Sequence, residues 1–208
     1  MSARGLYAIV DPAATRARDP EVIAKAILAG GCARLQLRFK DGPDRARLAL
    51  AQRVRALCAE AGVPFVVNDR PDLALLTKAD GLHLGQDDLP IAAARSLVPE
   101  AEIGLSTHDP AQARAAEAAG ADVVAFGPIF PTTSKAEPDP VVGLDALAAV
   151  CRATSRPVVA IGGLSLERAP AIRDAGAAWG AVIGAVCGAD DPEAAARALH
   201  HALGGEAS

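Results

Sequence analysis

The chain has 208 residues, of which 51% are apolar and 3% aromatic, and its 25 acidic and 21 basic side chains give a net charge of −4. This length suits one ordinary domain, and the apolar content excludes a largely disordered chain. The mildly acidic balance and the lack of a run of lysines and arginines exclude nucleic acid as the main partner. Any anionic ligand must therefore be held by a few placed cations.

The cysteines and the N-terminal segment bear on the location of the protein. The four cysteines lie far apart and form no C-x-x-C pair, so their spacing indicates neither a zinc site nor a disulfide framework. The first five residues lack the parts of a secretory signal, and no run approaches the ~18 apolar residues of a membrane helix. We expect a cytoplasmic protein with no membrane partner, and the sequence leaves homo-oligomerisation open.

Eight short apolar runs recur along the chain, several of them rich in β-branched residues, as is typical of strands buried on both faces of a parallel sheet. In chain order they cover residues 6–11, 33–39, 65–69, 81–85, 102–108, 122–127, 157–162 and 179–185. Longer stretches of helix-forming residues follow the runs, over residues 21–29, 44–61, 71–77, 91–98, 110–119, 144–151, 166–175 and 192–203. An aspartate before a proline predicts helix starts at Asp19, Asp109 and Asp191.

The number of these units predicts the fold. Eight strand–helix units in 208 residues leave about 26 residues for each, enough for a short strand, a short helix and two loops. This alternation predicts an α/β protein that forms a single (β/α)8 TIM barrel, one domain over residues 1–208. The alternative is an open doubly wound sheet. It is disfavoured because residues 11–14 do not carry the dinucleotide fingerprint G-x-G-x-x-G after the first run.

Polar residues at the carboxyl ends of the strands are the candidates for function, because these ends meet at one mouth of a barrel. Gln36, Arg38 and Lys40 are spaced by two, so all three side chains project to the same side of a strand. Two cations and an amide predict a site for a multiply charged anion. The alternative is a solvated strand end, which the apolar neighbours Leu35 and Leu37 disfavour.

Two carboxylates form a second candidate site. Asp69 and Asp88 end two consecutive strand units. Carboxylates that meet beside a phosphate site suit Mg²⁺, which takes its remaining oxygens from phosphates and water. The alternative is helix capping, by Asp69 before one predicted helix and by Asp87 or Asp88 before the next.

The histidines have less specific surroundings. His83 alternates with leucines and is expected to face the interior, either as a hydrogen-bonded structural residue or as a substrate contact. His108 precedes a helix start, where capping or packing is the ordinary role and acid–base catalysis the sharper alternative. His200 and His201, on the last helical stretch, are expected to be solvated. The sequence offers no evident nucleophile or acid–base dyad.

One connection, residues 128–142, is about fifteen residues long, and a loop of that length in an economical chain is usually functional, the alternative being a disordered insertion. It carries hydroxyls and one lysine over residues 132–135, which suit phosphate oxygens. The pairs Gly162-Gly163 and Ile183-Gly184 end the seventh and eighth runs. Loops at these positions of such barrels commonly bind phosphate through backbone N–H groups.

Taken together, these segments resemble the thiamine-phosphate synthase family, through residues 36–40, 68–70, 79–88, 104–106, 127–135 and 160–163. The resemblance implies condensation of 4-amino-2-methyl-5-hydroxymethylpyrimidine diphosphate with a thiazole phosphate, giving thiamine phosphate and pyrophosphate. It also implies Mg²⁺ as cofactor, phosphorylated small molecules as partners, and a dissociative path in which the diphosphate leaves before the thiazole nitrogen attacks.

The resemblance further implies roles for single residues. The diphosphate would be bound by Arg38, Lys40, Asn68, Ser106 and Lys135, and all of these except Asn68 would act in catalysis. Gln36 would orient the pyrimidine with His83 nearby, Asp69 and Asp88 would hold Mg²⁺, and the thiazole phosphate would contact Thr132, Ser134, Gly163, Ile183 and Gly184. Ser134 stands in place of the usual threonine and keeps the hydroxyl, whereas Gly184 often is a serine in the family, which implies a backbone contact here.

Two alternatives of other kinds stay open at this point. A related thiazole tautomerase, an isomerase, shares the scaffold and a Ser-x-His segment like residues 106–108, but it needs no metal or diphosphate site. Asp69 and Asp88 therefore argue against it. A catalytically silent phosphate-binding regulator is disfavoured by Arg38, Lys135 and the same two aspartates.

Overall fold

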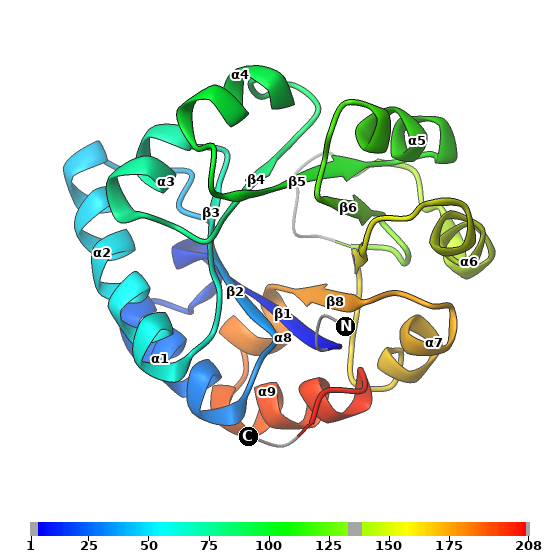
Figure 1. Ribbon diagram of the computed structural model, residues 1–208. Coiled ribbons are helices and arrows are strands. Elements are labelled where there is room, and N and C mark those ends of the chain that lie inside the picture. Colours follow the sequence, from blue (N-terminus) through cyan, green and yellow to red (C-terminus); the bar gives the residue numbers. More distant parts are fainter. Residues whose placement is uncertain (1–3, 133–138, 207–208) are drawn as a thin grey trace.

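Eight parallel strands pair in chain order and close into a barrel, because β8 also pairs with β1 (Figure 1). The computed structural model describes residues 4–132 and 139–206. The strands are β1 Gly5–Val10, β2 Arg34–Leu37, β3 Phe65–Asn68, β4 Gly81–Leu84, β5 Glu102–Thr107, β6 Val123–Phe126, β7 Val158–Ile161 and β8 Trp179–Val182. Closure leaves no unpaired sheet edge, and the predicted TIM barrel is confirmed.

Helices surround the barrel (Figure 1). They are α1 Pro20–Gly30, α2 Asp44–Ala61, α3 Pro71–Thr77, α4 Ile91–Leu97, α5 Pro110–Ala118, α6 Gly143–Ala153, α7 Ala169–Asp174, α8 Gly184–Cys187 and α9 Pro192–Ala202, with a 3₁₀ turn η1 at Pro12–Ala14. The predicted caps Asp19, Asp109 and Asp191 accept hydrogen bonds from N–H groups of the first helical turns. No helix in the described part of the chain is both long and apolar enough to cross a membrane.

Two differences from the predicted elements affect the mouth of the barrel. The eighth strand ends at Val182 instead of continuing to residue 185, because Ile183 leaves the extended conformation and the short helix α8 begins at Gly184. The turn η1, which the sequence did not predict, follows β1 directly and is capped by Asp11. Both segments lie where strand ends turn away from the barrel.

Side chains of the strands alternate between two separate cores. Leu6, Ala8 and Val10 belong to the large core between strands and helices, whereas Tyr7 and Ile9 belong to a smaller interior core. The interior core also contains Val66, Val123, Ala125, Val159, Trp179 and Ala181. Because the strands are buried on both faces, they read as continuous apolar runs in the sequence.

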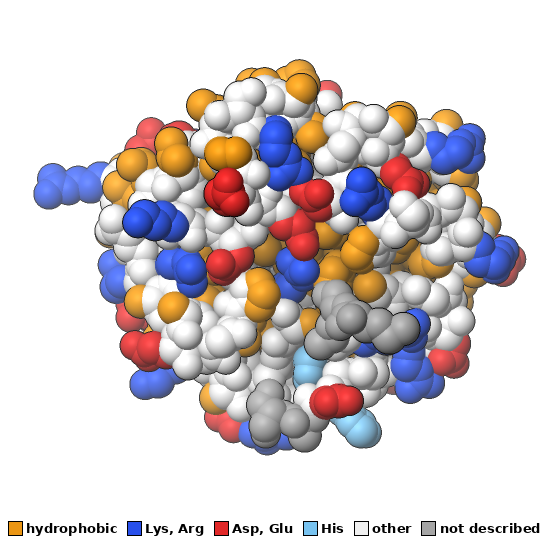
Figure 2. Space-filling model, in the orientation of Figure 1, with side chains coloured by type: hydrophobic (Ala, Val, Ile, Leu, Met, Phe, Trp, Pro, Cys, Tyr) orange, Lys and Arg blue, Asp and Glu red, His pale blue; other side chains and the backbone are white. Residues whose placement is uncertain are grey.

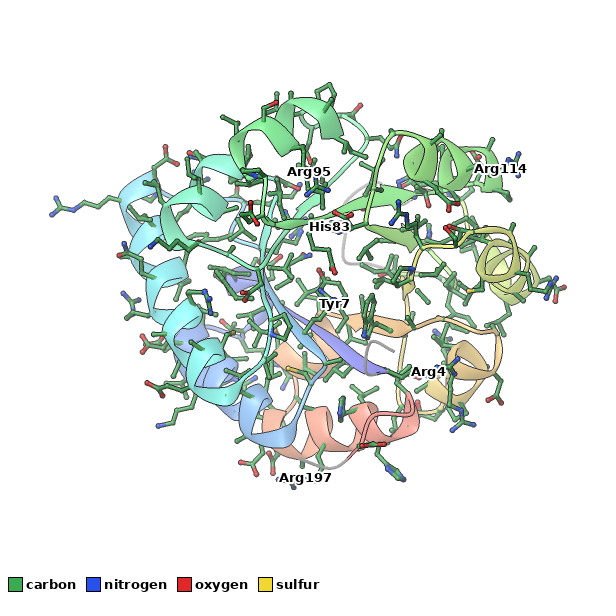
Figure 3. The ribbon with its side chains drawn as sticks, in the orientation of Figure 1. Arg4, Tyr7, His83, Arg95, Arg114 and Arg197 are labelled. Atoms are coloured by element: carbon green, nitrogen blue, oxygen red, sulfur yellow. The ribbon has the colours of Figure 1, made fainter. Side chains whose placement is uncertain are left out.

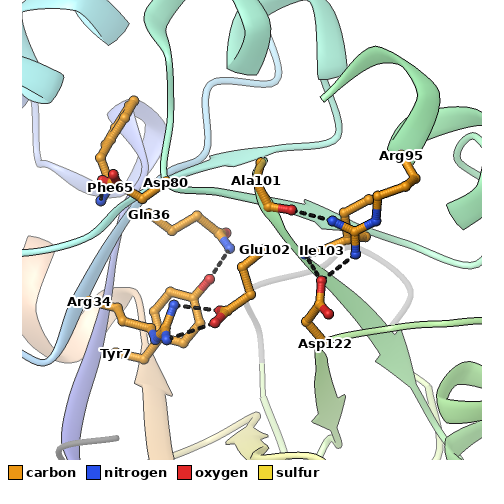
Figure 4. Close-up of polar contacts among 10 residues, drawn as sticks. All are labelled: Tyr7, Arg34, Gln36, Phe65, Asp80, Arg95, Ala101, Glu102, Ile103 and Asp122. Atoms are coloured by element: carbon orange, nitrogen blue, oxygen red, sulfur yellow. Dashed lines mark hydrogen bonds and ion pairs between the residues drawn. The ribbon is translucent and has the colours of Figure 1, made fainter. Parts of the chain in front are cut away.

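Charged side chains close the barrel at the amino ends of the strands, which we call the floor (Figure 4). The Arg34 guanidinium donates to both carboxylate oxygens of Glu102, at 2.5 and 3.1 Å, and lies 4.3 Å from the ring centroid of Trp179. A bidentate ion pair against an indole face is a strong arrangement for arginine. On the face drawn in Figure 2, acidic and basic side chains lie next to each other around the centre.

Two aspartates at the floor make the same kind of hydrogen bond, each to a backbone N–H of the preceding strand. Asp80 accepts the backbone N–H of Phe65 at 2.8 Å, and Asp122 accepts that of Ile103 at 2.9 Å (Figure 4). The second carboxylate also receives a hydrogen bond from Arg95. Each carboxylate therefore binds a backbone N–H at the start of a strand, since Phe65 is the first residue of β3 and Ile103 the second of β5.

His200 corrects the prediction of a solvated histidine, since only 9% of its surface is exposed. Its Nδ1 accepts the backbone N–H of Leu6 at 3.2 Å, and its Nε2 lies 3.2 Å from the carbonyl oxygen of Glu206. The ring thus joins the start of β1 to the segment after α9, and burial lowers the pKa of His200. His201 is exposed, as predicted.

Candidate active site

A cavity of about 900 Å³ opens at the carboxyl ends of the strands, which we call the mouth. Every predicted site residue that the structure describes lines it, namely Gln36, Arg38, Lys40, Asn68, Asp69, His83, Asp88, Ser106, Thr132, Gly163, Ile183 and Gly184. Ser134 and Lys135 lie outside the described residues. In Figure 3 the labelled side chains of Tyr7 and His83 point into the interior of the barrel.

The polar residues of β2 and its extension form one wall of the cavity, from its depth to its rim. Gln36 is buried, and its Nε2 donates to the Tyr7 hydroxyl at 3.0 Å. Burial raises the pKa of Tyr7, so the phenol stays protonated. Arg38 follows at the mouth, and Lys40 at the rim places its Nζ 3.2 Å from Oδ2 of Asp69. Both cations therefore lie on the wall of the cavity.

Asp11 is the residue of this region that sequence reasoning missed. It directly follows β1 and is only 6% exposed. Its Oδ1 accepts a hydrogen bond from the backbone N–H of Ala13 at 3.0 Å, and its Oδ2 accepts one from Nη1 of Arg38. The signal was present in the sequence, because Asp11 is an acidic residue at a strand end like Asp69.

Asp69 and Asp88 form the acidic part of the wall. Asp69 has a left-handed backbone with φ of 62°, and its N–H donates to the carbonyl of His83 at 2.8 Å. The Oδ2 of Asp88 accepts the N–H of Gly85 at 2.7 Å. Burial raises the pKa of Asp69, Lys40 opposes that rise and the nearby Asp88 carboxylate adds to it. Two like charges therefore share this point of the cavity.

The capping interpretation of these aspartates is wrong. The cap positions of α3 and α4 are Arg70 and Pro90, and neither helix has a side-chain cap. Asp69 lies one residue too early, and Asp88 bonds back to Gly85 instead of forward to α4. The carboxylates are thus not needed to start these helices.

A hydrogen-bonded histidine–serine pair lies in the same cavity as the carboxylates. His83 Nε2 lies 2.9 Å from Oγ of Ser106. The two residues meet because β4 and β5 pair with His83 opposite Gly104, two residues before the serine. Glycine is needed there, since a Cβ on Gly104 would lie 2.7 Å from the His83 ring.

His108 packs between the end of β5 and the long connection. Its backbone N–H donates to Gln112 at 2.8 Å, and its Nδ1 lies 2.7 Å from the carbonyl oxygen of Gly127. Its Nε2 lies 3.5 Å from Oδ2 of Asp139, which returns from the connection. The cap of α5 is Asp109, so His108 takes the packing role rather than the capping one.

The described ends of the long connection are fixed to the barrel. The N–H groups of Ile129 and Phe130 donate to the carbonyls of Ile161 and Gly162, at 2.9 and 3.0 Å. Gly163 has φ of 64°, and a Cβ there would lie 2.4 Å from the carbonyl oxygen of Pro131. Only glycine fits this contact. These contacts argue against a disordered insertion for residues 128–132.

The fold and the cavity define a class of protein, a (β/α)8-barrel enzyme with its site at the carboxyl ends of the strands and a wall suited to phosphorylated ligands. Comparison with known proteins gives the particular family. The model of the family described as thiamine monophosphate synthase matches residues 6–186.

Individual relatives agree with this match. The thiamine-phosphate synthase of Anaeromyxobacter dehalogenans (strain 2CP-C) is 50% identical over 200 residues, which cover 96% of this chain and 87% of that protein. The thiamine-phosphate synthase of Roseiflexus sp. (strain RS-1) is 46% identical over 196 residues, 94% of this chain and 83% of that one. Among solved structures, a thiamine phosphate pyrophosphorylase from Pyrococcus furiosus superposes with a TM-score of 0.89 at 34% identity, covering 97% and 96% of the two chains.

The chain therefore belongs to the thiamine monophosphate synthase family. Its activity is thiamine-phosphate synthesis, a transferase reaction of thiamine biosynthesis.

Proposed function

We propose that the mouth cavity binds the pyrimidine diphosphate and the thiazole phosphate together, and that its cations promote departure of the diphosphate. The observation that carries this proposal is the convergence of two cations, Arg38 and Lys40, with two carboxylates, Asp69 and Asp88, on one wall of the cavity. A volume of about 900 Å³ is in the range of sites that enclose small organic ligands.

The diphosphate would lie against the wall formed by Arg38 and Lys40. The guanidinium of Arg38 forks onto phosphate oxygens, and Lys40 supplies a point charge at the rim. Asn68 and Ser106 would donate further hydrogen bonds, and Lys135 would add a third cation. As the bond between the pyrimidine methylene carbon and the diphosphate oxygen breaks, the electron pair stays on the departing oxygen. Donors fixed around that oxygen stabilise the developing charge.

The pyrimidine would lie deeper in the barrel, where Gln36 and Tyr7 are the polar groups of an otherwise apolar interior. The Gln36 amide, held by the Tyr7 hydroxyl, would orient the ring, and His83 would contact it from β4. Departure of the diphosphate leaves a positive charge on the methylene carbon, which the electron-rich pyrimidine delocalises. The thiazole nitrogen then forms the new carbon–nitrogen bond, so no protein nucleophile is required.

Asp69 and Asp88 fit a Mg²⁺ ion by the chemistry of the donor set. The described residues contain no cluster of three or more metal-ligating His, Cys, Asp or Glu side chains, so the protein would supply two carboxylates. Mg²⁺ commonly takes one or two carboxylates and completes its shell with phosphates and water. The bound cation would neutralise the Asp69–Asp88 repulsion and the charge of the diphosphate.

The thiazole phosphate would lie on the opposite side of the mouth, at the ends of β6, β7 and β8. Thr132, Ser134, Gly163, Ile183 and Gly184 would bind its oxygens through hydroxyl and backbone groups. The left-handed turn at Gly163 supports this assignment because it brings the backbone beside Phe130 and Pro131, next to Thr132. Apart from its chain neighbours and its own helix, no described residue comes within 4 Å of a Cβ built on Gly184, so a phosphate has room to approach that backbone. A cytoplasmic location and self-association stay predictions.

The test is an assay of thiamine phosphate formation by the purified protein. We expect product only when both substrates are present, and we expect EDTA to stop the reaction and added Mg²⁺ to restore it. Retention of full activity in EDTA would overturn the metal assignment. Conversion of the thiazole phosphate tautomer without the pyrimidine substrate would favour a tautomerase, and binding of both ligands without turnover would favour a regulator.

A further inference from the structure

We infer that Asp11 is a positioning residue for the reaction: its buried carboxylate holds the Arg38 guanidinium in the orientation that meets the departing diphosphate. The inference rests on the proposed function, because it takes Arg38 as a ligand of that group. Asp11 itself does not line the cavity, whereas Arg38 does. The carboxylate therefore acts from behind the wall, through the arginine.

The geometry fixes both ends of this pair. Asp11 and Arg38 follow the adjacent strands β1 and β2, and the N–H of Arg38 donates to the carbonyl of Val10 at 2.9 Å. One carboxylate oxygen is held by the N–H of Ala13 in η1, and the other accepts Nη1 of Arg38. Backbone contacts on both sides thus determine where the carboxylate and the guanidinium meet.

The nearby cation Arg18 does not compete with Arg38 for the Asp11 carboxylate. Arg18 donates instead to the carbonyl oxygens of Cys187, at 2.6 Å, and of Thr15, at 3.0 Å. In the part of the chain that the structure describes, Asp11 is also the residue whose side chain binds the Arg38 guanidinium. Among the described residues the Arg38 guanidinium has no other hydrogen-bond acceptor, and its side chain, which is 20% exposed, lines the cavity.

The Asp11 carboxylate favours the reaction by orienting the Arg38 guanidinium. A negative charge behind an anion site weakens anion binding by Coulomb repulsion, so Asp11 does not contribute through its charge on the diphosphate. A free arginine side chain loses rotamer entropy when it is ordered, and pairing with a fixed carboxylate removes much of that freedom before the substrate arrives. The arginine is then already placed when charge develops on the leaving oxygen.

The first experiment compares Asp11→Asn with Asp19→Asn. Asparagine keeps an oxygen that can accept the hydrogen bond from the N–H of Ala13. It replaces the carboxylate oxygen that faces Arg38 with an NH₂ group and removes the negative charge. Asp19 is the matched control, because it caps its own turn through the N–H of Glu21, two residues on, and is exposed. We expect Asp11→Asn to lower kcat about 10- to 100-fold, with KM for the pyrimidine diphosphate changed less than about threefold. Asp19→Asn should leave both constants unchanged.

A double-mutant cycle with Arg38→Ala tests whether Asp11 acts through the arginine. In the Arg38→Ala background, Asp11→Asn should cause no further loss of kcat. It should also raise Tm there, since it removes a buried carboxylate that has lost its partner. An equal loss of kcat in both backgrounds would overturn the inference in favour of a structural role. Unchanged kcat with tighter binding of inorganic pyrophosphate to Asp11→Asn would overturn it too, by showing that Asp11 competes with the ligand.

Failure of the inference is distinguishable from failure of the proposed function. If Arg38→Ala itself retains wild-type turnover, the diphosphate role of Arg38 is wrong and the proposed function falls. If Arg38→Ala is slow and Asp11→Asn is not, only the positioning role falls. Should Asp11→Asn not fold, Asp11→Ser keeps an oxygen for the N–H of Ala13 and gives the same comparison.

Discussion

The two ends of the barrel use charged residues in opposite ways. At the floor, Arg34 and Glu102 meet through two hydrogen bonds against Trp179, so their charges are satisfied inside the protein. At the mouth, Asp69 and Asp88 place like charges side by side, and one of them has a left-handed backbone. Such unfavourable features persist where a ligand relieves them. The floor therefore stabilises the fold, whereas the mouth has the features expected of a site for a charged ligand.

The largest expected effect follows from Asp69→Asn. The asparagine removes one of the two like charges, and it tolerates the left-handed backbone that Asp69 adopts. We expect turnover to fall about 100- to 1,000-fold, because the proposed metal site and its charge stabilisation are lost. We expect Tm to stay equal or rise, since the repulsion from Asp88 is gone. Steady-state kinetics and thermal unfolding measure these two outcomes. A large drop in Tm would show that Asp69 stabilises the fold, as the ion pairs at the floor do.

At the floor, we expect Glu102→Ala to lower stability and to leave turnover nearly unchanged. Removing the carboxylate leaves the Arg34 guanidinium, whose side chain is 12% exposed, without its bidentate partner. We expect a loss of about 2 kcal/mol in the free energy of unfolding, measured in urea, with kcat changed less than about threefold. Glu193→Ala is the control. It removes a partner from an exposed pair with Arg197 and should cost less than about 0.5 kcal/mol.

Gly163→Ala should separate a backbone role at the mouth from simple strain. A methyl group there meets the carbonyl of Pro131 at 2.4 Å. Gly62 has a similar φ of 66°, but beyond its chain neighbours no described residue lies within 4 Å of a Cβ built there. We expect both alanine variants to lose about 1 kcal/mol of stability from the left-handed backbone alone. Only Gly163→Ala should raise KM for the thiazole phosphate, by about tenfold or more. Equal KM values in the two variants would remove Gly163 from the proposed phosphate site.

The fold and most of the site were predictable because each depends on local patterns. Eight apolar runs predicted eight strands, and polar residues at their ends predicted the lining of the mouth, since parallel strands bring all carboxyl ends together. The contacts between strands were not predictable. Asp11 meets Arg38, and His83 meets Ser106, only because particular strands are neighbours in a fixed register. Single-chain patterns carry no information on that register.

The prediction of a solvated His200 is wrong for a related reason. Its place on the last helix suggested a solvated side chain, but residues 204–206 fold back over its ring, and a Cβ on Gly205 would lie 2.3 Å from it. Helical periodicity describes only the contacts of the helix with the barrel. What a terminal segment covers depends on the tertiary path of the chain, which no pattern within the helix indicates.

The smallest effect that we expect is on the pH dependence of Tm, through His200 at the floor. Because burial lowers the pKa of His200, the unfolded chain binds a proton more readily than the folded one. The contribution of His200 is therefore fully present above the unfolded pKa of about 6.5 and is lost as the pH falls below that value. We expect Tm to decrease from pH 7 to pH 5, and His200→Gln to remove part of that decrease. Exposed His201 gives the control, because His201→Gln should leave the pH dependence unchanged. An identical pH profile in wild type and His200→Gln would show that other floor groups, not this ring, carry the acid sensitivity.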